Sequence, residues 1–145
     1  MASGAVRELL AGFPVWSADE RRAVLRTLVP EAGDTEMLVP FLLSIAESVD
    51  EEDLVRIEAI GVFSILTFAD SDSRRLATCR EQLMALAADD EDWDVRNAAG
   101  CAVFDLPGAD TVLERMREII AAEPEDFVKE NVAAALRLYE RRALG

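Results

Sequence analysis

Apolar residues recur along most of this chain at intervals of three and four positions, which is the spacing of one buried face on an α-helix. Mainly acidic stretches interrupt this pattern near residues 50, 90 and 124. Alanine, leucine, arginine and glutamate are abundant, and runs of β-branched or aromatic residues are scarce, which favours helix over strand. The pattern predicts eight helices, at residues 3–12, 18–29, 35–48, 53–68, 73–88, 94–105, 111–122 and 127–142.

Three of these stretches share a longer pattern that begins with a valine and a basic residue. The pairs are Val55-Arg56, Val95-Arg96 and Val128-Lys129, and the residues four, seven, eight and eleven positions after each valine are apolar. Such spacing places them on one side of a helix. Small residues follow the first of these positions in most copies, and they would let a neighbouring helix approach closely: Ile60-Gly61, Gly100-Cys101 and Ala133-Ala134.

An acidic turn precedes each valine, so that each unit consists of a helix, an acidic turn and a second helix. The valines lie 40 and 33 positions apart, within the range of two-helix repeats. A weaker first copy is predicted at Val24, Leu25 and Leu28, with Ser17 in the place of the valine. The turns contain Asp50, Glu51, Glu52 and Asp53; Asp89, Asp90, Glu91 and Asp92; and Glu123, Pro124, Glu125 and Asp126.

On these residues the chain resembles the HEAT-repeat family, over Asp50–Leu66, Asp89–Leu106 and Glu123–Tyr139. The resemblance implies an all-α fold, a short right-handed α-solenoid of about four two-helix repeats. It implies a single domain over residues 1–145, with units at about 1–30, 34–68, 73–106 and 110–142. In that family the repeat arginine pairs with acids of adjacent turns, which implies a ladder from Arg56, Arg96 and Lys129 to the turn carboxylates.

The net charge narrows the classes of partner. The chain has 15 lysines and arginines against 29 aspartates and glutamates, for a formal net charge of −14. Such a surface repels phosphate backbones and anionic lipids, which argues against nucleic-acid and membrane partners. It attracts basic proteins, although the same charge also has the plainer role of keeping the protein soluble.

The residue types present leave little room for catalysis. There is no histidine, so Ser-His-Asp and Cys-His systems are impossible. The alternation of Asp90, Asp92 and Asp94 resembles the start of an EF-hand, but the positions that need glycine and glutamate hold Val95 and Cys101. A carboxylate pair such as Asp92 and Asp94 could do acid–base work, yet solvated turn carboxylates are far commoner. We therefore expect a non-enzymatic protein without metal or cofactor.

Location is predicted from the same chain. The N-terminal stretch contains Glu8 and lacks the apolar core of a signal peptide, and no apolar run approaches the length of a membrane span. Cys79 and Cys101 show no metal-ligand spacing and are expected to be reduced. A cytoplasmic protein is expected, and the excess of arginine over lysine is typical of a GC-rich bacterial genome.

The two tryptophans, Trp16 and Trp93, have two interpretations. Each ring could cover the end of a helix pair, or each could be an exposed anchor surrounded by charge, as in interface hot spots. Leu54 and Phe127 lie within one position of the place of Trp93 in their own units. The acidic turns likewise could be a row of helix caps or a docking ridge on one edge of a solenoid.

These observations favour a protein-binding module. The sharper hypothesis is a bacterial immunity or antitoxin-like inhibitor whose acidic ridge is attracted to a basic protein. The alternative is a HEAT-type scaffold, adaptor or assembly factor that uses the exposed side of its second helices, at Ile57, Asn97 and Glu130. The residues predicted to bind the partner are Asp50, Glu51, Glu52, Asp53, Asp89, Asp90, Glu91, Asp92, Trp93, Asp94, Glu123, Glu125, Asp126 and Trp16.

Overall fold

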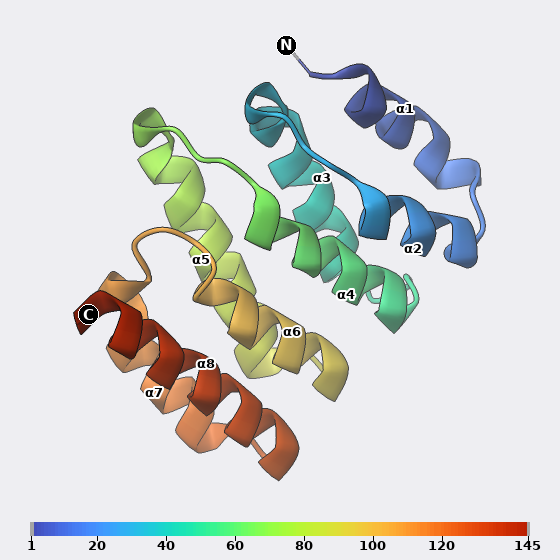
Figure 1. The fold of residues 1–145 in the computed structure, drawn as a ribbon. Helices are drawn as coiled ribbons and strands as arrows, with labels where there is room; N and C mark the ends of the chain where they lie inside the picture. Colours follow the sequence, from blue (N-terminus) through green and yellow to red (C-terminus); the bar gives the residue numbers. More distant parts are fainter. Residues whose placement is uncertain (1, 145) are drawn as a thin grey trace. The chain divides into compact units, whose positions relative to one another are not determined.

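The computed structural model describes residues 2–144, apart from the side chain of Asp70. In this part of the chain there are eight α-helices and five short 3-10 helices, with no strand, which confirms the all-α prediction (Figure 1). The α-helices are α1 Gly4–Gly12, α2 Ala18–Thr27, α3 Thr35–Glu47, α4 Asp53–Val62, α5 Ser73–Asp89, α6 Trp93–Val103, α7 Leu113–Ala122 and α8 Asp126–Leu144. The 3-10 helices are η1 Phe13–Val15, η2 Ala32–Asp34, η3 Phe63–Ile65, η4 Asp70–Asp72 and η5 Ala109–Val112.

The predicted helix bounds agree with the structure within about two residues, with α4 as the clearest exception. The sequence pattern predicts that this helix reaches residue 68, but it ends at Val62 and continues as the tighter 3-10 helix η3. The Ser64 hydroxyl donates a hydrogen bond of 2.8 Å to the Gly61 carbonyl oxygen. A side chain that takes a carbonyl of the last helical turn competes with the backbone ladder, so the α-helix stops there.

Contacts along the backbone divide the chain into two compact units, Met1–Arg74 and Arg75–Gly145. Unit 1 contains α1 to α4, and unit 2 contains nearly all of α5 together with α6, α7 and α8. Each unit therefore holds two of the four helix pairs that the sequence pattern predicts.

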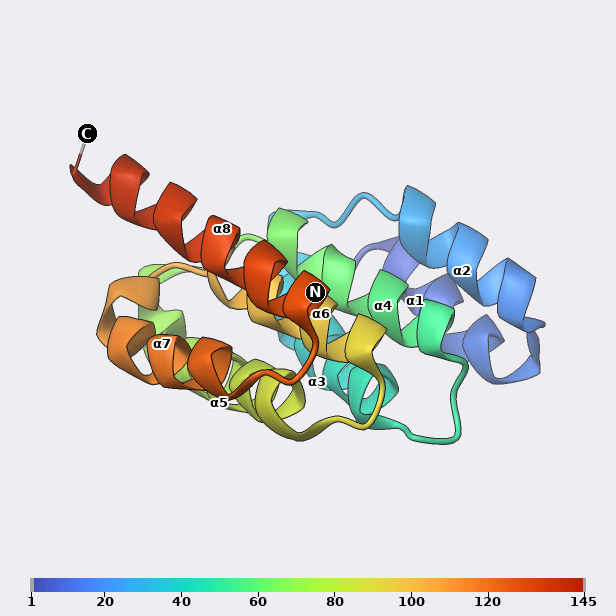
Figure 2. The same cartoon turned by 90° about the horizontal axis from the view of Figure 1, so that it is seen from below.

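In unit 1 the even-numbered helices form one layer and the odd-numbered helices the other, with α4 packed against both α2 and α3 (Figure 2). The Phe13 ring meets the Phe41 ring edge to face at 5.0 Å between centroids. The Arg21 guanidinium lies over the Phe13 ring, 5.0 Å from its centroid. The buried core comprises Val6, Leu9, Phe13, Leu25, Leu38, Leu42, Val55, Ala59, Ile60 and Phe63.

Unit 2 repeats this arrangement, with α8 packed against α6 and α7. Gly100 of α6 lies where α8 approaches most closely, because a Cβ at this position would stand 2.8 Å from a methyl carbon of Val132. The expected close approach at a small residue is therefore confirmed for Gly100, whereas Gly61 has open space around it. The core comprises Cys79, Leu83, Met84, Val95, Ala99, Val103, Leu106, Met116, Val132 and Leu136.

The register of the repeat is clear in the burial pattern of the second helices. Positions Val55–Ile60 and Val95–Gly100 have the same succession of buried and half-buried residues. The first copy, however, needs a correction. Ser17 is the N-cap residue of α2 and forms a capping box with Glu20. Counted from the caps, the valine position is taken by Glu20, and Arg21 stands where Arg56, Arg96 and Lys129 stand.

None of the helices in the described part of the chain has both the length and the apolar character that crossing a membrane requires.

Candidate protein-binding surface

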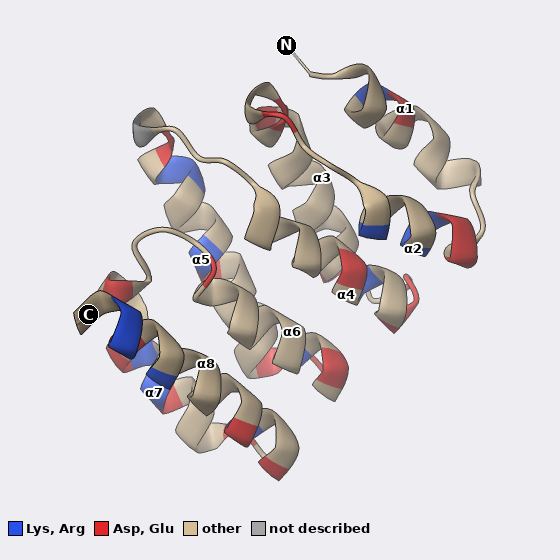
Figure 3. Cartoon of the chain, in the orientation of Figure 1, with Lys and Arg blue, Asp and Glu red and all other residues tan. Residues whose placement is uncertain are grey.

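Two acidic turns of unit 2 lie at the same end of its helices. One joins α5 to α6 at residues 89–94, and the other joins α7 to α8 at residues 122–127. Acidic residues gather at this end of α6 and α8 in Figure 3. The turns meet directly, because the Trp93 and Phe127 rings pack edge to face with centroids 5.7 Å apart and planes at 86°.

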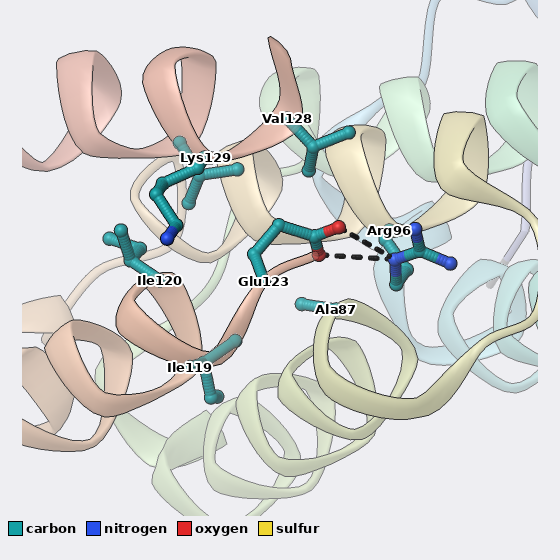
Figure 4. Close-up of a pocket in the computed structure, with 8 residues that line it drawn as sticks. Ala87, Arg96, Ile119, Ile120, Glu123, Val128 and Lys129 are labelled. Carbon is teal, nitrogen blue, oxygen red and sulfur yellow. Dashed lines mark hydrogen bonds and ion pairs between the residues drawn. The ribbon is translucent and has the colours of Figure 1, made fainter. Parts of the chain in front are cut away.

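A buried arginine holds the two turns together. The Arg96 Nε donates to both carboxylate oxygens of Glu123 at 3.1 Å, and its Nη1 donates to the carbonyl oxygens of Asp90 at 2.9 Å and Glu91 at 3.2 Å. The side chains of Arg96 and Glu123 are only 10% and 5% exposed, and Figure 4 shows the carboxylate directed at the guanidinium. Arg96 therefore donates hydrogen bonds to residues of both turns, and it holds in place the backbone segments that carry Trp93 and Phe127.

Some of the predicted binding acids are used inside the protein. Glu123 is the partner of Arg96 and also accepts the Glu125 backbone N–H at 3.2 Å. Asp90 accepts the Asp92 N–H at 2.9 Å, and Asp92 accepts the Asp94 N–H at 2.8 Å. The Asp94 side chain is half-buried and is also engaged. These acids cap helices and close turns, as the simpler interpretation of the acidic turns holds.

Other acids of the same turns have no such role. Asp89, Glu91, Glu125 and Asp126 are exposed, and their carboxylates form no hydrogen bond or ion pair with the described residues. Together with Trp93 and Phe127, which are 45% and 57% exposed, they form what we call the turn surface of unit 2. An exposed aromatic pair among uncommitted carboxylates is a surface suited to a partner that is both basic and partly apolar.

The turn surface carries two hollows. An open hollow of about 360 Å³ is lined by Trp93, Glu125 and Phe127. A second, of about 250 Å³, lies between the ends of α5 and α7 and is lined by Asp89, Glu118, Ile119 and Glu123 with two alanines. A third space, beside the Arg96–Glu123 pair in Figure 4, measures about 10 Å³. This is room for about one water molecule, so it is a packing defect and not a ligand site.

In the acidic turn of unit 1, too, some acids have a partner within the protein and others do not. Glu51 pairs with Arg21 at 2.9 Å, and Asp53 accepts the Leu54 N–H at 3.0 Å. Asp50 and Glu52 are exposed and make no such contact with the described residues. The α3–α4 turn of unit 1 thus supplies one carboxylate to an arginine of α2, just as the α7–α8 turn of unit 2 supplies one to an arginine of α6.

Trp16 lies in unit 1 and is held by packing. It follows η1, and its ring lies against Gly12, where a Cβ would stand 2.3 Å from a ring carbon. Its centroid is also 6.4 Å from that of Phe13. The ring therefore covers the end of α1, as the packing interpretation of the tryptophans proposes, and it is less exposed than Trp93.

The implied ladder of basic residues is only partly present. Arg96 and Arg21 each pair with an acid of the following turn. Arg56 is buried and donates from Nε to the Ala46 carbonyl oxygen at 2.9 Å. Lys129 forms no ion pair with the described residues, which corrects the expectation for this residue. Its ammonium lies beside Ile120 in Figure 4.

The two thiols are poorly suited to nucleophilic chemistry. Cys79 is fully buried, and burial raises the pKa of its thiol to about 11 against the weaker opposing effect of Arg75 and Arg80. Burial, with a contribution from Asp105, also raises the pKa of Cys101. Both cysteines are free. A thiol with a raised pKa stays protonated at neutral pH and is a weak nucleophile.

Sequence reasoning named Trp93 but did not include Phe127 or Arg21 in the site. Phe127 is the more important omission, because it completes the aromatic pair. Its signal was its place one position from that of Trp93 in the repeat. Arg21 is missed when Ser17 is taken as the counterpart of the repeat valine. The capping box shows that Ser17 is the N-cap residue, so the valine position falls three residues later, at Glu20.

The fold and this surface define an all-α protein with an acidic, aromatic-bearing end on unit 2. Comparisons with protein-family models, with curated proteins and with solved structures found no match.

Proposed function

We propose that this chain is a non-enzymatic protein-binding module of the HEAT-like α-solenoid kind, whose turn surface on unit 2 binds a basic protein. The observation that carries the proposal is the Trp93–Phe127 pair, exposed among four carboxylates that have no partner within the described residues. Contiguous exposed apolar patches rimmed by polar residues often mark interaction sites, and aromatic residues are enriched at protein interfaces. The helix caps in these turns need the engaged acids only, so capping does not account for the others.

The sharper form of the proposal is an immunity or antitoxin-like inhibitor of bacterial origin that acts in the cytoplasm by occlusion. A net charge of −14 supports it, because electrostatic attraction speeds the encounter with a basic cleft by orders of magnitude at low salt. In this role the aromatic pair would be the central anchor, and the exposed acids would surround it.

The proposal is tested by capture of partners followed by kinetics. The tagged chain is used to capture proteins at low and at physiological salt, between which the Debye length falls from about 30 Å to about 8 Å. The association rate of the captured protein, once purified, is then measured against salt. A single basic partner whose association slows roughly tenfold or more over this range supports the proposal.

A pair of charge-matched variants sharpens the test. In the first, the four exposed acids of the turn surface become amides: Asp89→Asn, Glu91→Gln, Glu125→Gln and Asp126→Asn. In the control, four exposed acids elsewhere are changed in the same way: Glu8→Gln, Asp19→Asn, Glu36→Gln and Glu47→Gln. Both variants lose the same charge, so binding that weakens in both alike excludes a specific role for the turn surface.

The same experiments distinguish the inhibitor function from the alternative, a scaffold or adaptor function. A partner that is neutral or acidic, or one whose association barely depends on salt, would support the scaffold or adaptor function. In that case changes at the half-buried Asn97 of α6 and the exposed Glu130 of α8 should weaken binding, and the turn-surface variant should not.

A further inference from the structure

We propose that the hollow formed by Trp93, Phe127 and Glu125 is a receptor for the guanidinium group of an arginine side chain of the basic partner. The inference rests on the proposed function, because it names the group of that partner which the turn surface recognises. It assigns a chemical role to the hollow of about 360 Å³ that these three residues line.

The two rings offer faces and not only edges. An edge-to-face pair, here at 86° and 5.7 Å, uses the edge of one ring and one face of the other. Part of each ring stays accessible, since Trp93 and Phe127 are 45% and 57% exposed and both line the hollow. The face of an aromatic ring carries partial negative charge and attracts cations, most strongly for tryptophan.

The charge around the rings selects a cation over a neutral ligand. Glu125 lines the hollow, and its carboxylate has no partner among the described residues. Asp126 is adjacent in sequence, and Glu91 lies in the turn that leads to Trp93; both are exposed and equally uncommitted. A ligand placed there meets ring faces and a carboxylate at once, which suits a group that is flat, weakly hydrated and positively charged.

Helix ends at this surface do not oppose the cation. The N-termini of α6 and α8 are the positive ends of their dipoles. Asp92 and Glu123 already accept backbone N–H groups there, from Asp94 at 2.8 Å and from Glu125 at 3.2 Å. Each helix end amounts to only about half a positive charge, so the four exposed acids still leave an excess of negative charge that attracts a positive ligand.

Geometry favours arginine over lysine. A guanidinium group can stack on a ring face while its edge donates two hydrogen bonds to a carboxylate, whereas an ammonium is a compact, strongly hydrated point charge. Two aromatic residues and an acid, Glu125, line the hollow together. A guanidinium group can therefore interact favourably with the rings and with the carboxylate, whereas an ammonium group interacts mainly with the carboxylate.

The probe for this site is the fluorescence of Trp93. The chain has two tryptophans, so a Trp16→Phe variant leaves Trp93 as the only one. This variant is titrated with tetra-arginine, tetra-lysine and tetra-citrulline peptides of the same length. We expect tetra-arginine to change the emission and to bind roughly fivefold more tightly than tetra-lysine, and tetra-citrulline to have no effect.

Two matched pairs of variants test the hollow itself, with binding followed by calorimetry. Phe127→Leu keeps apolar bulk but removes the ring face, and it should lower tetra-arginine affinity about threefold while leaving tetra-lysine binding nearly unchanged. Glu125→Gln should weaken binding clearly more than Glu91→Gln, which removes the same charge outside the hollow. Thermal unfolding of each variant should stay close to that of the parent, because all three positions are exposed.

Equal affinity for arginine and lysine peptides, or equal effects of Glu125→Gln and Glu91→Gln, would overturn this inference and leave a general attraction of basic groups. The proposed function would then still stand on the kinetics with its protein partner. Conversely, selective arginine binding without any basic protein partner would support the hollow and remove the proposed function.

Discussion

In unit 1, Asp34 is the last residue of η2 and its side chain is fully buried. Its carboxylate accepts hydrogen bonds from the Ser3 N–H at 2.6 Å, the Ser3 hydroxyl at 2.9 Å and the Glu31 N–H at 2.8 Å. Burial alone would raise the pKa of Asp34, but these hydrogen bonds outweigh it and hold the pKa below the usual value. The ionised carboxylate therefore attaches the start of α1 to the turn before α3.

Asp34→Asn should lower the free energy of unfolding by about 2 kcal/mol, because hydrogen bonds to a charged acceptor are replaced by bonds to a neutral amide. Since the folded pKa lies below the unfolded one, this contribution is complete above the unfolded pKa and is lost as the pH falls through the folded pKa. Urea unfolding at neutral and at acidic pH measures both effects. Glu36→Gln, an exposed change of equal charge, should have little effect, and equal losses in the two variants would contradict this account.

Between elements, the separation of α6 and α8 is set by a glycine. A Cβ on Gly100 would lie 2.8 Å and 3.0 Å from the two methyl carbons of Val132. Valine has one strongly preferred rotamer in a helix, so its methyl groups cannot turn aside easily. Gly61, at nearly the same point of α4, has nothing within 4 Å of its Cβ position. Two glycines of similar place in the repeat thus have opposite roles.

Gly100→Ala should destabilise the protein by roughly 1–3 kcal/mol, because the helices must move apart. Gly61→Ala should stabilise it by about 0.5–1 kcal/mol, because alanine favours helix and meets no neighbour. Thermal or urea unfolding of the two single variants distinguishes the signs. If both substitutions stabilise the fold, α6 and α8 do not approach each other as closely as described.

For the molecule as a whole, charge repulsion outweighs charge pairing at the surface. The net charge is −14; the Arg115–Glu81 pair is exposed on both sides, and the Arg26–Glu58 pair on the arginine side. Exposed pairs contribute about 0–1 kcal/mol each. The repulsion among many acids acts over longer distances and is screened by salt.

The melting temperature should therefore rise with sodium chloride, by a few degrees between about 10 mM and 150 mM, where the Debye length shortens from about 30 Å to about 8 Å. Calorimetry at a series of salt concentrations measures this. The control variant with four exposed acids changed to amides should show a smaller rise. A melting temperature that falls with salt would mean that ion pairs dominate.

Sequence reasoning went furthest with the helices and least far with the roles of individual acids. The spacing of Val95, Ala99 and Val103 specifies one side of α6, and all three are buried. No local pattern distinguishes Glu123, which is buried against Arg96, from Glu125, which is exposed. The two differ only in whether an arginine from another helix lies within reach.

The order of hydrophobic and polar residues was enough to specify an all-α chain, the positions of its helices and the acidic turns between them, because these depend on neighbours along the chain. The pairing of Glu123 with Arg96, 27 positions away, and the meeting of Trp93 with Phe127 depend on contacts between residues that are far apart in the sequence. Such contacts exist only after α6 and α8 have packed together. For that reason the repeat could be predicted from the sequence, whereas the aromatic pair and its uncommitted carboxylates required the structure.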